Sequence, residues 1–157
     1  MTEFGLAAMG GTFDIIHKGH IALLSKAFSI SSKVIIGLTS DELAQKRGKK
    51  TLNKYEQRFD KLMDTIKAIF PNHSFEISKL DDDFGPAIFK EHVQALVVSD
   101  ETSNQGEILN LLRSKKNLSP VKIVIVPMVL AKDGNRISTT RIKNSEIDIE
   151  GNLSSID

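Results

Sequence analysis

The sequence of 157 residues contains no cysteine and no tryptophan, and it has only one tyrosine and four prolines. Without cysteine the chain has no disulfide, no thiol nucleophile and no zinc–thiolate site. Its stability has to come from a packed apolar core, which one domain of this length can bury. We therefore expect a single domain over residues 1–157, with a frayed tail after about residue 151.

Long apolar runs and a strong excess of one charge are also missing. The longest apolar runs, Val34–Leu38 and Ile123–Leu130, are far shorter than the roughly 20 residues that span a bilayer. The N-terminal residues lack the basic start and apolar stretch of a signal peptide, so we expect a cytoplasmic protein without a membrane partner. The formal net charge of +1 disfavours a nucleic-acid partner, because nucleic-acid-binding proteins usually carry a clear basic excess.

Two common phosphate-binding motifs are absent as well. Gly5 and Gly10 have the spacing of the motif G-x-x-x-x-G-K-[ST], but Gly11 stands where that motif requires lysine. The motif G-x-G-x-x-G does not occur either. P-loop kinases and nicotinamide-dinucleotide dehydrogenases therefore lose their main sequence support.

Apolar runs that alternate with helix-like segments indicate an α/β fold. Five runs are typical of buried strands: Leu6–Met9, Val34–Leu38, Phe75–Ile77, Ala95–Val98 and part of Val121–Val129. Helical patterns cover residues 21–28, 54–70 and 102–116, and further helices are expected from Pro86 and from Ser138. The apolar residues expected to face the core in the second and third of these patterns are Phe59, Leu62, Met63, Ile66, Ile69, Phe70, Ile108, Leu111 and Leu112. This order predicts a five-stranded parallel sheet that binds its ligand beyond the carboxyl ends of the strands.

The first expected strand leads into an unusual string of residues. It reads Gly10-Gly11-Thr12-Phe13-Asp14-Ile15-Ile16-His17-Lys18-Gly19-His20. Adjacent glycines let the backbone turn sharply and approach a ligand, and the start of the following helix favours a phosphate. Two histidines three residues apart can both donate to phosphate oxygens, and His20 is the first candidate for the transferred phosphate. A strand–helix turn with a histidine cap and a metal site at the histidine pair are the alternatives.

A second anion-binding turn is indicated near the C-terminus. Residues Ile137–Thr140 read Ile-Ser-Thr-Thr and lie between Arg136 and Arg141. The hydroxyl and N–H groups of Ser138 and Thr139 could hold phosphate oxygens, although the same residues also make an ordinary helix cap. If this turn faces the first glycine turn, the two would flank one crevice large enough for a triphosphate.

A basic segment follows the second expected strand and a short turn at Ser40–Glu42. The polar stretch Gln45–Lys50 contains Lys46, Arg47, Lys49 and Lys50, and a solvated, mobile loop is its simplest interpretation. One lysine could still reach a phosphate when substrate binds. Lys46 and Lys49 are the candidates, and the sequence does not separate them. Nucleic-acid binding is disfavoured, because no aromatic residues alternate with these charges.

The two turn motifs together resemble the nucleotidyltransferase superfamily with the H-x-G-H signature. His17–His20 matches that signature, and Ile137–Thr140 matches the second signature, I-S-[ST]-[ST], about 120 residues later. Over residues 8–151 the chain is similar to phosphopantetheine adenylyltransferases of the archaeal and eukaryotic type. Segments Ile36–Glu42, Val97–Thr102 and Asp133–Ser138 carry this likeness. The resemblance implies a Rossmann-like, doubly wound nucleotidyltransferase (HUP-type) fold.

The resemblance also implies an activity in coenzyme A biosynthesis. The family transfers the adenylyl group of ATP to 4′-phosphopantetheine, normally with Mg²⁺, and forms pyrophosphate and dephospho-coenzyme A, a product that the site could retain. The residues that would contact ATP are Gly10, Gly11, Thr12, Phe13, His17, His20, Ser99, Asp100, Glu101, Thr102, Arg136, Ile137, Ser138, Thr139 and Thr140. Those that would contact the acceptor are Thr12, Lys46 and Leu80, and those that would act in catalysis are His17, His20, Lys46 and Lys49. No residue is expected to ligate a metal directly.

The sequence departs from the bacterial form of the family and leaves other activities open. The bacterial form has an arginine-rich stretch after strand four, where this chain has Ser99–Thr102. The roles of those arginines cannot be transferred, and Arg113 is only a weak substitute. A cytidylyltransferase, or an adenylyltransferase for flavin or nicotinamide mononucleotide, would share the fold and both signatures. Such cytidylyltransferases typically carry Arg-Thr-x-Gly before Ile-Ser-Thr, whereas Arg136 directly precedes Ile137. A nucleotide-binding module without turnover is a further alternative, and the oligomeric state is not predicted.

Overall fold

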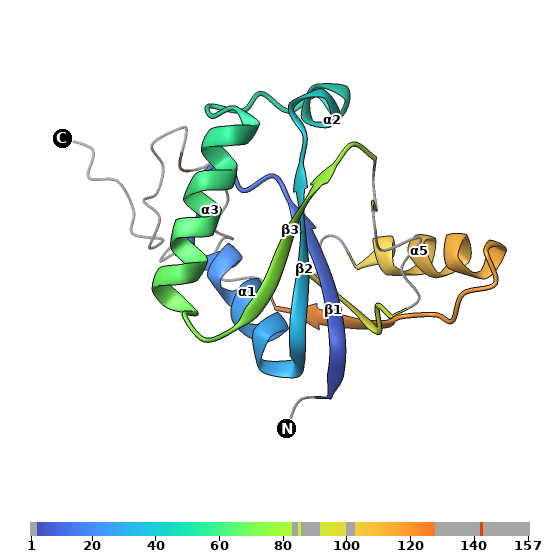
Figure 1. Ribbon diagram of the computed structural model, residues 1–157. Helices are drawn as coiled ribbons and strands as arrows, with labels where there is room; N and C mark the ends of the chain where they lie inside the picture. The colour runs from blue at the N-terminus through green and yellow to red at the C-terminus, as the bar shows by residue number, and fades with distance from the viewer. Residues whose placement is uncertain (1–2, 83–84, 86–91, 100–102, 128–141, 143–157) are drawn as a thin grey trace.

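The computed structural model describes residues 3–82, 85, 92–99, 103–127 and 142. These residues contain a parallel five-stranded sheet in the order β3-β2-β1-β4-β5, which confirms the α/β prediction (Figure 1). The strands are β1 (Phe4–Gly11), β2 (Ser31–Thr39), β3 (Ser74–Leu80), β4 (Ala95–Ser99) and β5 (Lys122–Val126). The helices are α1 (Lys18–Ile30), α2 (Asp41–Lys46), α3 (Tyr55–Ile69) and α5 (Asn104–Lys115). Within the described residues, no helix has the length and apolar character needed to cross a membrane.

Helices cover both faces of the sheet, so the core has two parts. In Figure 1, α1 and α3 lie on one side of the strands and α5 lies on the other. The larger part packs Leu24 and Phe28 of α1 and Leu62 of α3 against alternate strand residues such as Ile36. The smaller part packs Leu109 of α5 against residues of the opposite strand face. Burial on both faces explains why the strands read as nearly continuous apolar runs.

The strand order reverses at β1, and this places the ligand-binding end. Strand β1 pairs with β2 over its whole length, from Phe4 to Gly11. Its pairing with β4 joins Ala7 to Ala95 and Ala8 to Leu96. In a doubly wound sheet the crevice for a ligand opens beyond the strand ends where the order reverses. The segment that follows Gly11 lies at this point.

The structure corrects several details of the sequence prediction. Helix α1 begins at Lys18, so His20 lies in its first turn rather than before it. The expected turn at Ser40–Glu42 is the start of α2, because the Ser40 hydroxyl caps the helix by accepting from the Leu43 N–H. The helix expected from Pro86, the helix expected from Ser138 and the tail after residue 151 lie outside the described residues.

Three residues expected in the core are exposed. Ile69, Ile108 and Leu111 are about half-exposed, with exposed fractions of 50%, 47% and 59%. Ile69 lies in the last turn of α3, whose buried residues are Arg58, Leu62 and Ile66. In α5 the buried side contains Leu109 and Arg113 instead, so Ile108 and Leu111 point outward. The apolar pattern therefore predicted helix α5 correctly, although two of the apolar residues that indicated it do not lie on its buried side.

We expect Gly37→Ala to lower the free energy of unfolding by about 1–3 kcal/mol through overpacking. A Cβ atom at Gly37 would lie 2.7 Å from Cγ of Leu80, which is buried at the end of β3. Gly5→Ala is the matched control in β1, since its Cβ would meet only Gln94 Oε1 at 3.6 Å. Urea unfolding should show a loss for the Gly37 variant alone. Equal stabilities of the two variants would contradict the packing described.

Candidate active site

In the turn between β1 and α1, the absence of a side chain at Gly11 leaves room for the ring of Phe13. Phe13 has a φ of 51°, which is rare for a residue with a side chain. Its ring is buried against Gly11, where a Cβ atom would lie 2.9 Å from Phe13 Cε2. The ring also packs beside His20, with 4.8 Å between the ring centroids. A side chain at Gly11 would therefore displace Phe13 and, through it, His20.

The two histidines of the turn are fixed by backbone hydrogen bonds. His17 is the N-cap residue of α1, and its Nδ1 accepts from the Gly19 N–H at 3.0 Å. His20 Nδ1 accepts from the His17 N–H at 3.2 Å, and the two rings lie 4.0 Å apart. Because Nδ1 is an acceptor in both rings, the neutral form of each carries its hydrogen on Nε2. Each neutral ring can therefore donate through Nε2 to a phosphate oxygen.

Burial keeps His20 uncharged near neutral pH. The pKa of His20 is lowered to about 3, first by desolvation and then, to a smaller extent, by electrostatic interactions with His17 and Lys49. A histidine with this pKa acts as a neutral hydrogen-bond donor rather than as a general acid. This state suits a group that holds a phosphate oxygen throughout a reaction.

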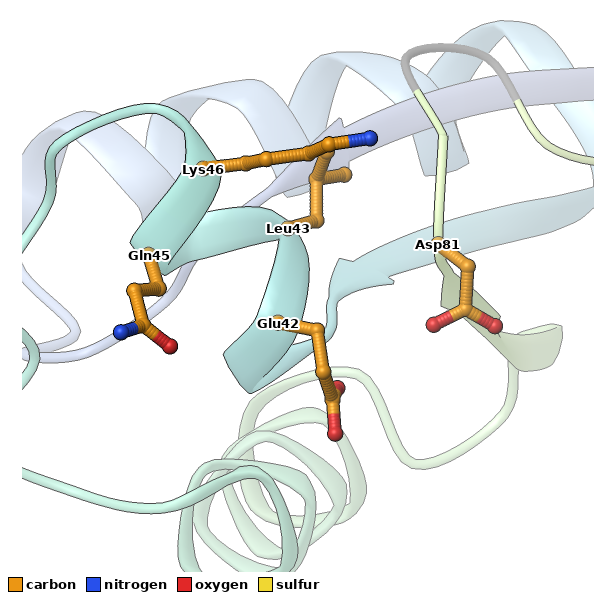
Figure 2. A pocket seen from close by; sticks show the side chains of 5 residues that line it. All are labelled: Glu42, Leu43, Gln45, Lys46 and Asp81. Atoms are coloured by element: carbon orange, nitrogen blue, oxygen red, sulfur yellow. The ribbon is translucent and has the colours of Figure 1, made fainter.

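The structure separates the two candidate lysines. Lys49 lies at the glycine turn, with its Nζ 3.5 Å from Thr12 Oγ1. Lys46, in the last turn of α2, lines a pocket of about 380 Å³ together with Glu42, Leu43, Gln45 and Asp81. Figure 2 shows the Lys46 side chain extending over Leu43 toward the side on which Asp81 lies. Lys49 is therefore the lysine beside the histidine pair, and Lys46 lies where β3 ends.

A buried arginine that the sequence analysis did not select ties this region together. Arg58 of α3 has no exposed surface. Its Nη1 donates to the carbonyls of Thr12 at 2.9 Å and Thr39 at 2.7 Å, and its Nε donates to the Asn53 carbonyl at 3.1 Å. Its Nη2 forms an ion pair with Asp41 at 2.8 Å. Arg58 therefore joins the glycine turn, the end of β2, the start of α2 and the segment before α3.

A buried aspartate makes a second connection between the same segments. Asp14 accepts hydrogen bonds from the N–H groups of Leu52 and Asn53. The sequence analysis missed both Asp14 and Arg58. A signal was present for Arg58, because it lies four residues before Leu62 and eight before Ile66, on the apolar side of α3. Charged residues on such a side are rarely buried without a specific set of partners.

The other predicted site residues have different outcomes. Ser99 ends β4 and is half-buried. Leu80 ends β3, is buried, and its carbonyl accepts from the Ser40 N–H at 2.8 Å. The predicted nucleotide contacts at residues 100–102 and 136–140 lie outside the described residues.

Arg113 does not replace the arginines of the bacterial form. It is fully buried and donates to the carbonyls of Ser119 at 2.8 Å and Val93 at 3.5 Å. Both carbonyls precede strands, so Arg113 lies at the amino ends of β4 and β5, away from the glycine turn. Desolvation lowers the pKa of its guanidinium. Its described contacts are with the backbone, in keeping with its being only a weak substitute for those arginines.

We expect Arg58→Met to lower the free energy of unfolding by on the order of 3 kcal/mol, because buried carbonyls lose their donor. Asp41→Asn is the matched control. Asp41 is the exposed partner of Arg58, with a side-chain exposure of 41%, and a pair of this kind contributes about 1 kcal/mol or less. Urea unfolding of both variants measures the difference. Similar losses would show that the ion pair, rather than the carbonyl contacts, is the important interaction.

The lowered pKa of His20 predicts a pH dependence of stability. The unfolded chain binds a proton at His20 below about pH 6.5, whereas the folded protein, with a His20 pKa of about 3, does not. Acid therefore favours the unfolded state, and the free energy of unfolding falls as the pH decreases from 7 to 5. The share of His20 is on the order of 1–2 kcal/mol. Urea unfolding at both pH values should show a smaller change for His20→Gln than for the unmodified chain; equal changes would contradict the assignment.

Comparison with known proteins agrees with this geometry. A family model described as cytidylyltransferase-like matches residues 8–145. A phosphopantetheine adenylyltransferase of Methanosarcina mazei is 43% identical over 149 residues, which cover 93% of this chain and 95% of that protein. One of Methanopyrus kandleri is 34% identical over 148 residues, which cover 94% of each.

Solved structures also resemble the chain. The crystal structure of a protein with unknown function from Archaeoglobus fulgidus has a TM-score of 0.71 and 27% identity. The match covers 78% of this chain and 89% of that one. The sheet, the two-sided helix layers and the whole-length sequence likeness agree with one another. The chain therefore belongs to the cytidylyltransferase-like family and, within it, to the phosphopantetheine adenylyltransferases.

Proposed function

We propose that this chain transfers the adenylyl group of ATP to 4′-phosphopantetheine and releases dephospho-coenzyme A and pyrophosphate. Relatives that match more than nine-tenths of its length are named phosphopantetheine adenylyltransferase. The observation that carries the proposal is the glycine turn at the reversal of strand order, where the His20 ring and the Lys49 ammonium lie together. Such a turn suits a phosphate group, because it combines close backbone approach with directed donors.

The reaction needs alignment more than it needs a base. A phosphate monoester has a second pKa near 6, so the acceptor is largely a dianion at neutral pH and is already nucleophilic. One of its oxygens forms a bond to the α-phosphorus of ATP. The bond from that phosphorus to the oxygen that bridges to the β-phosphate breaks, and pyrophosphate leaves with the electron pair. The protein then has to hold two anions in line and stabilise the charge that develops.

The described residues divide this task between them. The Nε2–H of neutral His20 and the ammonium of Lys49 would hold the α-phosphate, with His17 and the backbone of Gly10–Phe13 beside it. Thr12 would lie near the acceptor phosphate, since its hydroxyl is 3.5 Å from Lys49 Nζ. The pantetheine arm would extend toward Leu80 and the pocket lined by Lys46 and Asp81. From the sequence, residues 99–102 would lie near the nucleotide and residues 136–140 would hold the leaving pyrophosphate.

Magnesium would enter with the nucleotide. Among the residues that the structure describes, no three histidine or acidic side chains form a metal-binding group. Mg²⁺ commonly keeps several waters and binds through substrate phosphates, so MgATP is the substrate that we propose. We propose that a chain with this activity works in the cytoplasm, as expected from the sequence.

Pyrophosphate release tests the proposal. We expect release only when MgATP and 4′-phosphopantetheine are both present, and none when CTP replaces ATP. Release with CTP and an alcohol phosphate would identify a cytidylyltransferase. Release with ATP and flavin or nicotinamide mononucleotide would identify a different adenylyltransferase, and nucleotide binding without any release would identify a binding module. Each of these results would overturn the proposed reaction.

The separation of the two lysines predicts different kinetic effects. Lys49→Ala should lower kcat by about 100- to 1000-fold, as loss of one transition-state donor typically does. Lys46→Ala should mainly raise KM for 4′-phosphopantetheine and leave kcat within about tenfold, because Lys46 lies beside the pocket at the end of β3. Steady-state kinetics with each substrate varied will distinguish the two. The reverse pattern would place the catalytic lysine in α2.

A further inference from the structure

The carboxylate of Asp14 joins the glycine turn to the loop that carries Lys49. Asp14 is only 4% exposed. Its Oδ2 accepts from the Leu52 N–H at 2.8 Å, and its Oδ1 accepts from the Asn53 N–H at 3.0 Å. The side-chain amide of Asn53 donates to the Asp14 carbonyl at 3.0 Å and to Oδ1 at 3.2 Å. Leu52 and Asn53 follow Asp14 by 38 and 39 positions in the sequence, so these hydrogen bonds fix two distant segments against each other.

The loop over residues 47–53 is also fixed at its other end. The Lys49 N–H donates to the Ala44 carbonyl at 2.9 Å, and the Gly48 N–H donates to the Gln45 carbonyl at 3.0 Å. Gly48 has a φ of 74°, which lets the chain leave α2 in this direction. Lys49 therefore lies between an anchor at the end of α2 and the anchor at Asp14. Its ammonium meets Thr12, two residues before Asp14.

A purely structural role would not require a buried carboxylate at this position. Burying a carboxylate costs free energy unless its oxygens are well satisfied by hydrogen bonds. The oxygens of Asp14 accept from the backbone of the segment that leads back to Lys49. The contact thus sets the distance between the histidine pair and the lysine, which come from different crossovers of the sheet.

We propose that Asp14 is a positioning residue for adenylyl transfer, because it holds the loop over residues 47–53 so that Lys49 lies over the glycine turn beside His20. The inference rests on the proposed function, in which Lys49 contacts the α-phosphate. Without this anchor the loop stays attached at α2 but the ammonium loses its fixed place. A misplacement of about 1 Å in such a group can cost about 100-fold in rate.

A double-mutant cycle on kcat tests this coupling. Asp14→Asn preserves the size of the side chain but turns an NH₂ donor toward a backbone N–H group. We expect kcat to fall about 100-fold while KM for ATP changes little. In a chain that already carries Lys49→Ala, the same change should lower kcat by no more than about twofold, because no ammonium remains to be positioned. Losses that multiply in the double variant would overturn the proposal.

Asn110→Ala is the matched control for a loss of stability alone. Asn110 holds Val121 by two hydrogen bonds, Nδ2 to the Val121 carbonyl at 3.1 Å and the Val121 N–H to Oδ1 at 2.7 Å. Both lie at the amino end of β5, far from the glycine turn. Asn110→Ala should leave kcat within about twofold of its value in the unmodified chain. Combined with Lys49→Ala, its effect on kcat should be independent of the effect of Lys49→Ala. All rates are measured below the onset of unfolding of each variant.

Hydrogen exchange gives a readout that does not depend on turnover. Asp14→Asn should raise the exchange of amides in residues 47–53, whereas Asn110→Ala should not. Unchanged exchange in that loop would overturn the anchor itself.

If Asp14→Asn does not fold, Asn53→Ala takes its place in the cycle, since it removes two of the contacts and keeps the backbone donors. An unmodified chain that never releases pyrophosphate would refute the proposed function and the positioning role with it, whereas multiplicative losses in an active enzyme would refute the positioning role alone.

Discussion

The buried guanidinium of Arg58 is the interaction on which the geometry of the site depends. It has no exposed surface, and its donors reach three backbone carbonyls and one carboxylate. An arginine can be buried only if its planar set of N–H groups finds acceptors in fixed directions. Those acceptors belong to the glycine turn, the end of β2 and the segment before α3. Two crossovers of the sheet, from β1 to β2 and from β2 to β3, are thereby held in one arrangement before any substrate binds.

The same compact arrangement determines the charge of the site. His20 lies against the Phe13 ring and close to His17, and burial keeps it neutral at physiological pH. The site can therefore combine the ammonium of Lys49 with an uncharged donor at His20. A neutral donor keeps its hydrogen bond to a phosphate across a wide pH range. The strained backbone of Phe13 fits this interpretation, since strain of this kind persists where surrounding contacts determine the conformation.

Much of the fold followed from the sequence, whereas the connections inside the site did not. Five apolar runs and the intervening helical patterns predicted the parallel sheet, and the glycine–histidine string lies beyond β1, where the strand order reverses; phosphate binding there stays a prediction. The local pattern could not choose between Lys46 and Lys49, because the choice depends on α2 and on contacts with the distant Thr12 and Asp14. Arg58 was missed for the same reason: its contact with Thr12 spans 46 residues, and periodicity reports only neighbours within one helix.

The central claim is that the site aligns the acceptor phosphate and the α-phosphate of ATP for direct transfer, with no covalent intermediate on the protein. The stereochemical course at the α-phosphorus tests this claim most directly. One epimer of the α-thio analogue of ATP is converted with 4′-phosphopantetheine, and the configuration of the product is determined. A single in-line displacement predicts inversion. Retention would require two displacements through an adenylylated residue and would contradict the account.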